Sequence, residues 1–391
     1  MPAPSLARLR IVFLALCLAI VAGPLLMTPV HFDKGDFGSG PRVIHPFPRL
    51  DRHLASWTAF PAAFEAFYNE HFRLRGFYMR LYAYAMWDGF HVSPSSKVLV
   101  GRDGWLYYND VTDNDPIATY QGTNLLTDAQ VEAARSALAA WRDWLQARGI
   151  AFVVCVAPEK TSIYPEYLPT GFATHTSRTR IDQLLAACAG PDGVEIVDLR
   201  GPLLQAKETN PLPLYFRTDT HWNAAGASIG AGALLQALHA RLPAIAPLAA
   251  ADFPTELQPA PPGDLAKMIG VPTGLRDWTA AYPPRSDTVV KTVSPEQGVV
   301  VVAQDRPGLS PPLPRALFFR DSFSSGLIPF LSPDFSRAVY IWDHQLDPRL
   351  IEKEKPDLVV LEMVERYFSR TVDLLPPDEV LRRYPKSFYL P

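Results

Sequence analysis

Short apolar runs, separated by segments with helical spacing, recur along this chain and limit the folds that it can adopt. One run extends from Ile150 to Val156 and another from Val194 to Leu199, with a helix expected near Arg180 to Ala189 between them. Four later runs have the same character: residues 298–302, 316–319, 338–342 and 358–362. Strands that are apolar throughout are typical of sheets covered by helices on both faces. The chain is therefore predicted to form an α/β fold.

Two local signals mark the start of this region. From Val98 to Tyr108, two apolar stretches enclose a Gly-Arg-Asp-Gly turn. This pattern predicts a β-hairpin, because such a turn needs residues that tolerate positive φ. A long amphipathic helix is expected next, with Thr127 as its N-cap and its end near Ala147.

Near the N-terminus, an apolar run from Ile11 to Met27 follows two arginines. The run is short for a membrane-spanning helix and long for the apolar core of a signal peptide, so its length leaves both open. Pro24 follows the small residues Ala22 and Gly23, where it disfavours cleavage, and this favours an uncleaved anchor. Because basic residues precede the run, the short end is expected to stay in the cytoplasm and the rest to be exported.

The predicted organisation has three parts. Residues 1–34 are expected to form a cytoplasmic tip with a transmembrane anchor, and residues 35–97 a helical arm that packs on the main domain. The main domain covers residues 98–391, with loop insertions around residues 242–297. The net charge of −3 and the pI near 6.3 give no basic footprint for nucleic acid. Among the three cysteines, Cys155 and Cys188 are expected as buried free thiols rather than as a disulfide.

A candidate catalytic triad consists of Asp219, His221 and Ser322. An Asp two residues before a His can accept a hydrogen bond from imidazole Nδ1 and leave Nε2 free to act as a base. About a hundred residues later, Ser322 follows an apolar strand at a sharp turn before a helix. A serine hydroxyl needs such a base, and backbone N–H groups of Ser322 and Phe323 are expected to hold the oxyanion.

Alternatives remain open from the residues alone. Ser324 and Ser325 are rival nucleophiles, although both are expected within the helix rather than at the turn. Surface hydrogen bonding also accounts for an Asp-x-His pair. No metal site is predicted, because no third ligand is evident beside the Asp219 motif. His344 follows Asp343 and is expected in a loop or rim, since adjacent strand residues point to opposite faces.

Several motifs, in the same order, resemble the alginate O-acetyltransferase AlgJ/AlgX family. They are the Asp-Thr-His-Trp of residues 219–222, the Gly-Arg-Asp-Gly-Trp-Leu-Tyr of residues 101–107, Pro158-Glu159-Lys160, Gly263-Asp264-Leu265, Asp321-Ser322-Phe323, and Lys355-Pro356-Asp357 running to Glu365-Arg366-Tyr367. The resemblance implies an SGNH-hydrolase-like three-layer α/β sandwich with a rearranged strand order. It also implies a periplasmic protein, anchored to the bacterial inner membrane, that acetylates an exopolysaccharide such as alginate.

By this resemblance, Asp219 orients the base, His221 is the general base, and Ser322 is the nucleophile that becomes acetylated. No bound cofactor is expected, because the acetyl group would come from a partner of the membrane-bound O-acyltransferase type. The wider SGNH pattern has Gly-Asp-Ser at the nucleophile, whereas this chain has Arg320 in place of the Gly. The charge of Arg320 can attract an acidic sugar, and a salt bridge to Asp321 or Glu362 accounts for it equally well.

Lys160, in a polar loop after the first strand, is a further candidate for substrate binding, with a paired loop lysine as the alternative. Tyr215 and Arg217, beside the Asp219 motif, are also candidates. The same triad would serve a periplasmic carbohydrate esterase, because only the exclusion of water separates transfer from hydrolysis. An inert polysaccharide-binding or assembly protein is a third possibility. Nothing in the sequence specifies the polysaccharide.

Overall fold

In the computed structural model, the chain is described over residues 10–19, 45–71, 75–90, 92–172, 178–249, 252–253, 256–270, 275–281, 290–294, 299–303 and 312–386. It divides into two compact units. One comprises residues 1–95 with 267–272, and the other comprises residues 96–266 with 273–391. Asp219, His221 and Ser322 all belong to the second unit. The predicted bounds of the helical arm and of the main domain stay predictions.

The first unit contains a helix over residues 10–19, α2 (Leu54–His71), α3 (Arg75–Tyr84) and the π-helical turn η1 (Ala85–Gly89). The ring of Phe47 lies against the rings of three phenylalanines on α2, with centroid distances of 6.4, 6.0 and 5.1 Å to Phe60, Phe64 and Phe67. Edge-to-face contacts at these distances are favourable. At least part of the aromatic stripe in the predicted arm is therefore packing surface.

The predicted membrane anchor is wrong. It was expected from Ile11 to Met27, but the helix that the structure describes covers residues 10–19, and residues 20–27 lie outside the described part of the chain. Within the described ranges, no helix is long and apolar enough to cross a membrane. The predicted location at the bacterial inner membrane depended on this anchor, and it is therefore wrong as well.

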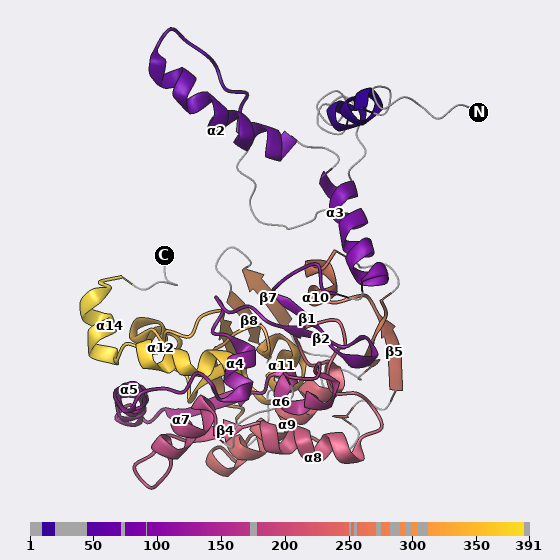
Figure 1. The fold of residues 1–391 in the computed structure, drawn as a ribbon. Coiled ribbons are helices and arrows are strands. Elements are labelled where there is room, and N and C mark those ends of the chain that lie inside the picture. Colours follow the sequence, from indigo (N-terminus) through magenta and orange to yellow (C-terminus); the bar gives the residue numbers. More distant parts are fainter. Residues whose placement is uncertain are drawn as a thin grey trace. The chain divides into compact units, whose positions relative to one another are not determined.

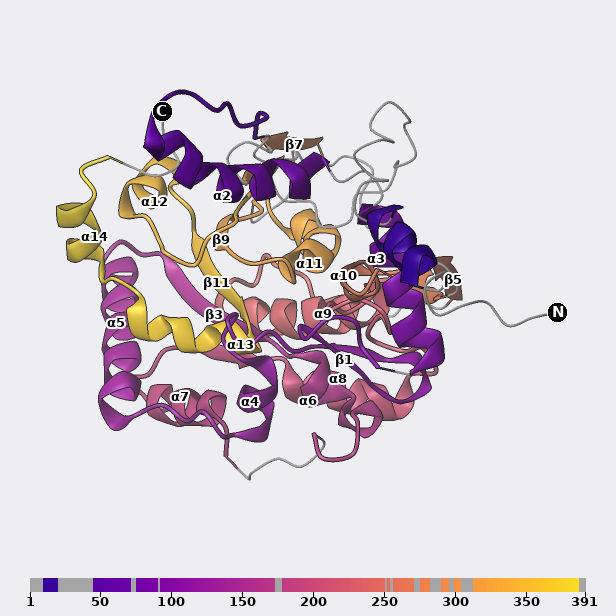
Figure 2. The ribbon, with the colours of Figure 1, turned by 45° about the horizontal axis from the view of Figure 1, so that its top comes forward.

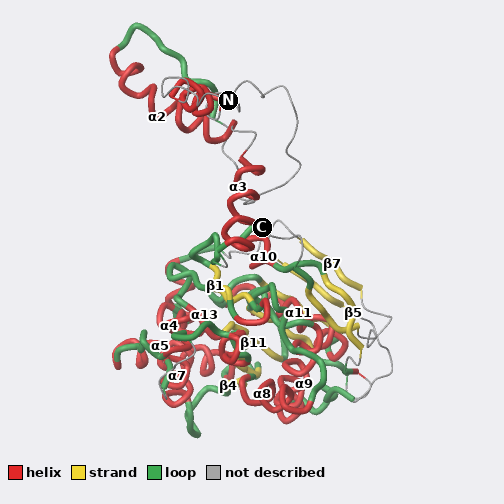
Figure 3. Tube along the Cα trace, turned by 45° about the vertical axis from the view of Figure 1, so that its right-hand side comes forward, coloured by secondary structure: helices red, strands yellow, loops and turns green. Residues whose placement is uncertain are grey.

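A seven-stranded sheet forms the centre of the second unit. Strands are yellow in Figure 3. In spatial order its strands are β4 (Ile196–Asp198), β3 (Ala151–Ala157), β11 (Leu358–Val364), β9 (Arg315–Phe319), β10 (Arg337–Ile341), β8 (Val299–Ala303) and β7 (Val290–Ser294). The first five strands are parallel to one another. At one edge, β8 pairs antiparallel with β10, and β7 pairs antiparallel with β8. The predicted α/β fold is confirmed, and the strand order does not follow the chain order.

Helices cover both faces of this sheet (Figures 1 and 2). One face packs on α8 (Arg200–Thr209), α9 (Ala224–Arg241) and α11 (Ser324–Leu331). The other packs on α5 (Asp128–Gln146), α7 (Arg180–Cys188), α12 (Pro348–Glu354) and α14 (Pro377–Arg383). Successive residues of a strand point to opposite faces, which explains why the strands are apolar throughout. Cys155 and Cys188 belong to the two different faces and are free thiols.

The predicted local signals are present. Thr127 caps α5 with a reciprocal capping box, accepting from the N–H of Gln130 while the Gln130 side chain accepts from the Thr127 N–H. In the hairpin, Asp103 and Gly104 have φ of 54° and 76°. The remaining helices and strands are β1 (Val98–Val100), β2 (Leu106–Tyr108), α4 (Pro116–Gln121), α6 (Lys160–Ile163), β5 (Glu256–Ala260), α10 (Asp264–Met268), β6 (Asp277–Ala281) and α13 (Glu365–Phe368), with short 3₁₀ turns at Arg102–Gly104, Pro165–Tyr167, Ser332–Asp334 and Ser369–Asp373.

Candidate active site

Ser322 lies on the turn between β9 and α11, at the carboxyl edge of the sheet. The preceding residue, Asp321, is buried, and its carboxylate accepts from the backbone N–H of Phe323 at 2.9 Å and of Val364 at 2.7 Å. It thereby ties the turn to the end of β11. The sequence prediction of a strand, a sharp turn and a helix is confirmed, but the Phe323 N–H, one of the two predicted oxyanion donors, is already bound by Asp321.

Hydrogen bonds from Lys160 hold the backbone of the segment that carries Asp219 and His221. The Lys160 ammonium donates to the backbone carbonyls of Phe216, Arg217 and Asp219, at 3.1, 3.2 and 2.6 Å. Burial lowers the pKa of Lys160 to about 8, although the charge of Asp219 and other carboxylates opposes this. A buried ammonium with three carbonyl acceptors fixes the backbone from which the two functional side chains extend.

The structure brings the three predicted triad residues together. His221 Nδ1 lies 2.6 Å from Asp219 Oδ1, and His221 Nε2 lies 2.7 Å from Ser322 Oγ. These are hydrogen-bond distances for a base with an orienting carboxylate on one side and a hydroxyl on the other. The arrangement has the geometry of a triad, and the catalytic role of its members stays a prediction.

Electrostatics support a charged Asp219 and a basic His221. Burial alone would raise the pKa of Asp219, but its hydrogen bonds and the charge of His221 lower it to about 2. Burial likewise opposes protonation of His221, yet the hydrogen bond and the negative charge of Asp219 raise its pKa above the ordinary value of 6.5. His221 is therefore a stronger base than an isolated histidine.

The sequence motif Gly263-Asp264-Leu265 supplies a clamp for this pair that sequence reasoning did not assign. The Asp264 N–H donates to Asp219 Oδ2 at 2.8 Å. In return, the Asp264 carboxylate accepts from the Thr220 N–H at 2.8 Å and the Thr220 hydroxyl at 2.6 Å. A Cβ added to Gly263 would lie 2.3 Å from the Asp219 Cβ, so the close approach of the two loops requires a glycine.

Asp264 also changes the assessment of metal binding. The sequence showed no third ligand beside Asp219 and His221, whereas in the structure potential ligand atoms of these two residues and Asp264 lie within 4.8 Å of one another. The donor set nevertheless fits a hydrogen-bonded cluster better than a cation site. His221 Nδ1 and Asp219 Oδ1 are 2.6 Å apart, in direct contact with each other, and both Asp264 oxygens accept from Thr220.

The four predicted substrate-binding residues have different positions. Arg217 is exposed, as a binding role needs. Lys160, Tyr215 and Arg320 are only 3%, 1% and 3% exposed. The Tyr215 hydroxyl donates to the Pro158 carbonyl at 2.6 Å, and Arg320 Nη1 donates to the Asp321 carbonyl at 2.9 Å. These three side chains are buried and bonded to backbone carbonyls around the site, and a role for them in substrate binding stays a prediction.

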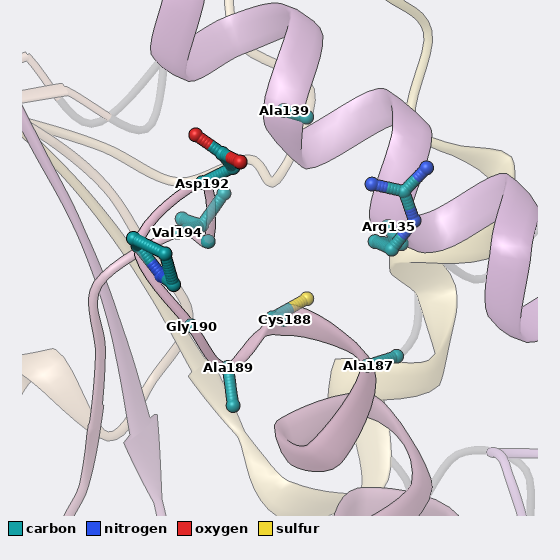
Figure 4. A pocket seen from close by; sticks show the side chains of 10 residues that line it. Arg135, Ala139, Ala187, Cys188, Ala189, Gly190, Asp192 and Val194 are labelled. Carbon is teal, nitrogen blue, oxygen red and sulfur yellow. The ribbon is translucent and has the colours of Figure 1, made fainter.

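An open cavity of about 430 Å³ gives access to the triad. It is lined by Phe216, Asp219, His221, Trp222, Asn223, Ala224, Ser322, Phe323, Ser325, Gly326 and Pro329. Another hollow, of about 170 Å³, lies between α5 and α7 and is lined by Arg135, Cys188 and the loop of residues 189–194 (Figure 4). None of the site residues lines that second hollow, so the first cavity is the candidate active site.

Comparison with known proteins identifies the family. The sequence profile of the family described as "SGNH hydrolase-like domain, acetyltransferase AlgX" matches residues 98–340. The chain belongs to this AlgX family. The resemblance drawn from the motifs is thereby confirmed, and so is the SGNH-hydrolase-like class of the α/β fold.

Several curated relatives carry the name "Probable alginate O-acetylase AlgJ". The protein of Pseudomonas aeruginosa is 30% identical over 167 residues, which is 42% of this chain and 39% of the relative. The protein of Azotobacter vinelandii is 26% identical over 372 residues, which is 90% of this chain and 88% of the relative. The alignments with the proteins of Pseudomonas aeruginosa, Pseudomonas fluorescens and Pseudomonas syringae span less than half of those proteins' lengths, from 39% to 44%.

The chain is also similar to solved structures. A DHHW family protein from Eubacterium siraeum is 17% identical, with a TM-score of 0.50 over 72% of this chain and 97% of that one. The O-acetyltransferase domain of Pseudomonas putida AlgJ is 22% identical, with a TM-score of 0.43 over 70% of this chain and 92% of that one. At these identities, the likeness to the Eubacterium protein concerns the fold alone.

Proposed function

We propose that this AlgX-family protein transfers acetyl groups to hydroxyls of a polysaccharide through an acetyl-Ser322 intermediate. The observation that carries the proposal is the continuous chain of hydrogen bonds from Asp219 through His221 to Ser322, at 2.6 and 2.7 Å, beside an open cavity. The names of the curated relatives support an acetylation reaction and a polysaccharide of the alginate type.

In the first step, Ser322 Oγ attacks the carbonyl carbon of an acetyl donor, and its proton passes to His221 Nε2. The carbonyl π electrons move to oxygen, and the resulting oxyanion accepts a hydrogen bond from the Ser322 N–H. Collapse of this intermediate expels the leaving group, which takes the proton from His221. Asp219 stays ionised throughout and stabilises the imidazolium.

In the second step, His221 Nε2 removes the proton of a sugar hydroxyl, whose oxygen attacks the acetyl carbon of acetyl-Ser322. The second oxyanion collapses by breaking the bond to Ser322 Oγ, which regains its proton from His221. Arg217, the exposed candidate beside the Asp219 motif, is proposed to bind an acidic sugar. The acetyl donor is proposed to be presented by a partner protein of the O-acyltransferase type, and the chain itself needs no bound cofactor.

The proposal is tested by intact-mass measurement of the purified protein with a nitrophenyl acetate, beside the variant Ser322→Ala. An acetyl adduct in the wild type only, discharged faster by an added oligosaccharide than by water, is the expected result. Discharge by water alone would make the protein a carbohydrate esterase. No adduct, with equal ester turnover in both proteins, would contradict the triad and favour a role in polysaccharide binding or assembly.

A further inference from the structure

Acyl transfer through Ser322 needs more oxyanion donors than the turn itself supplies. The Phe323 N–H, the second donor that the sequence predicts, is buried and bound to Asp321 Oδ1 at 2.9 Å. The Ser325 N–H is also engaged, because it donates to the Ser322 carbonyl at 3.0 Å. Since an oxyanion is stabilised by donors already pointing at it, the polar side chains on the cavity wall are candidates for a further donor.

Ser325 has the position that such a donor needs. It lies three residues after Ser322 at the start of α11, and residues three apart share one face of a helical turn. Both serines line the same cavity. Its neighbour Ser324 does not qualify, because it is 1% exposed and its hydroxyl donates to Glu362 Oε2 at 2.6 Å.

Arg320 fixes the direction of the Ser325 hydroxyl. Arg320 Nη1 donates to Ser325 Oγ at 3.0 Å, so a lone pair of that oxygen is occupied and its own proton must point elsewhere. Within the described ranges, the Ser325 hydroxyl has no acceptor in the protein. The proton is therefore available to a group in the cavity.

Arg320 is itself held rigidly. Besides Ser325, Nη1 contacts the Asp321 carbonyl at 2.9 Å, and the guanidinium lies 4.2 Å from the centre of the Trp342 ring. The side chain is 3% exposed. A donor that is oriented before substrate arrives needs no reorganisation during the reaction.

We propose that the Ser325 hydroxyl is a catalytic oxyanion donor, with Arg320 as the residue that positions and polarises it. When Ser322 Oγ bonds to the acetyl carbon and the carbonyl π electrons move to oxygen, that oxygen accepts hydrogen bonds from Ser325 Oγ–H and the Ser322 N–H. No proton is transferred from Ser325. This explains a role for Arg320 in place of the glycine of the wider SGNH pattern, and it rests on the proposed function.

The test is the single-turnover rate at which a nitrophenyl acetate acetylates Ser322, measured without any sugar. Ser325→Ala is expected to slow acetylation by about 10²-fold, the usual effect of removing one oxyanion donor. Ser325→Thr keeps the hydroxyl and should retain a rate within about threefold of the wild type, as expected for a donor role. A matched loss in the affinity of a boronic acid that forms a tetrahedral adduct on Ser322 is also expected for Ser325→Ala.

A wild-type acetylation rate in Ser325→Ala, with slower discharge to an oligosaccharide, would overturn the inference and make Ser325 a sugar-binding residue. Arg320→Met should lower the acetylation rate about as much as Ser325→Ala. The double variant should show no further loss, because both changes disable the same donor, the Ser325 hydroxyl. Additive losses would contradict the link between the two residues. Ser322→Ala separates the two proposals. If this variant is acetylated at the wild-type rate, the proposed function is contradicted, whatever the result for Ser325.

Discussion

Two aspartate–histidine pairs flank the nucleophile turn, and only one has the geometry of a catalytic pair. Asp219 Oδ1 lies 2.6 Å from His221 Nδ1, whereas Asp321 Oδ2 lies 3.6 Å from His344 Nε2. The carboxylate oxygens of Asp321 accept hydrogen bonds from the N–H groups of Phe323 and Val364. The Asp219 oxygens also accept from backbone N–H groups, of His221 at 3.0 Å and of Asp264 at 2.8 Å, but Oδ1 in addition accepts from the imidazole ring.

The difference shows that the chemistry of a carboxylate depends on what its lone pairs already accept. The pKa of Asp321 is lowered, against the effect of burial, by His344 and by the two backbone N–H groups. The pKa of Asp219 is lowered mainly through His221. Substitution at Asp219 should therefore affect activity most, and substitution at Asp321 should affect stability as well.

The largest effect is expected for Asp219→Asn. Loss of the charge removes the cause that raises the pKa of His221, and an amide does not fix the required tautomer, so kcat/KM should fall by about 10⁴-fold. Because His221 acts only when neutral, wild-type activity should rise with pH through a midpoint above 6.5, and in the variant this midpoint should move to lower pH. A pH profile of kcat/KM checks both. An unchanged midpoint would show that Asp219 does not govern His221.

Gly263→Ala should have the next largest effect on the catalytic pair. The added Cβ would overlap the Asp219 Cβ at 2.3 Å, so the Asp264 N–H must withdraw from Asp219 Oδ2. We expect kcat/KM to fall by about 10²-fold, because small misplacements of catalytic groups cost about this much. Gly89→Ala, where no atom lies within 4 Å of the added Cβ, is the matched control. Equal activity in both variants would contradict the clamp.

The sequence predicted six of the seven strands of the central sheet, because each is a short apolar run, but β7 falls in the stretch expected as a loop insertion. Asp219 and His221 were paired because they are close in sequence, whereas Ser322, about a hundred residues later, was joined to them from its place between an apolar strand and a helix. The Asp264 clamp was not predicted, since its contact with Asp219 joins segments 45 residues apart and depends on loop geometry. Arg320 was predicted either to attract an acidic sugar or to form a salt bridge with Asp321 or Glu362. In the structure a ring contact with Trp342 and hydrogen bonds to the Asp321 carbonyl and to Ser325 hold it inside.

Asp321→Asn should separate stability from activity. An amide places an NH₂ group against one of two backbone N–H donors, Phe323 or Val364, and leaves it unsatisfied. We expect the free energy of unfolding to fall by about 1–3 kcal/mol, the usual cost of an unpaired buried polar group. Loosening of the turn should lower kcat/KM by about tenfold, a smaller loss than in Asp219→Asn. Urea unfolding and ester turnover measure the two effects; a loss of activity without a loss of stability would give Asp321 a direct catalytic role.

His344→Gln should have the smallest effect. His344 lies in the loop after β10, and its side chain is 17% exposed with Nε2 at 3.6 Å from Asp321 Oδ2. At 3.6 Å, its Nε2 does not form a full hydrogen bond, and Asp321 remains anchored by backbone N–H groups without it. We expect kcat/KM within about threefold of wild type and an unchanged pH midpoint, because His221 keeps its own carboxylate. A loss as large as that of Asp219→Asn would show that the second pair takes part in proton transfer, and Asp321 could then no longer be assigned to the backbone alone.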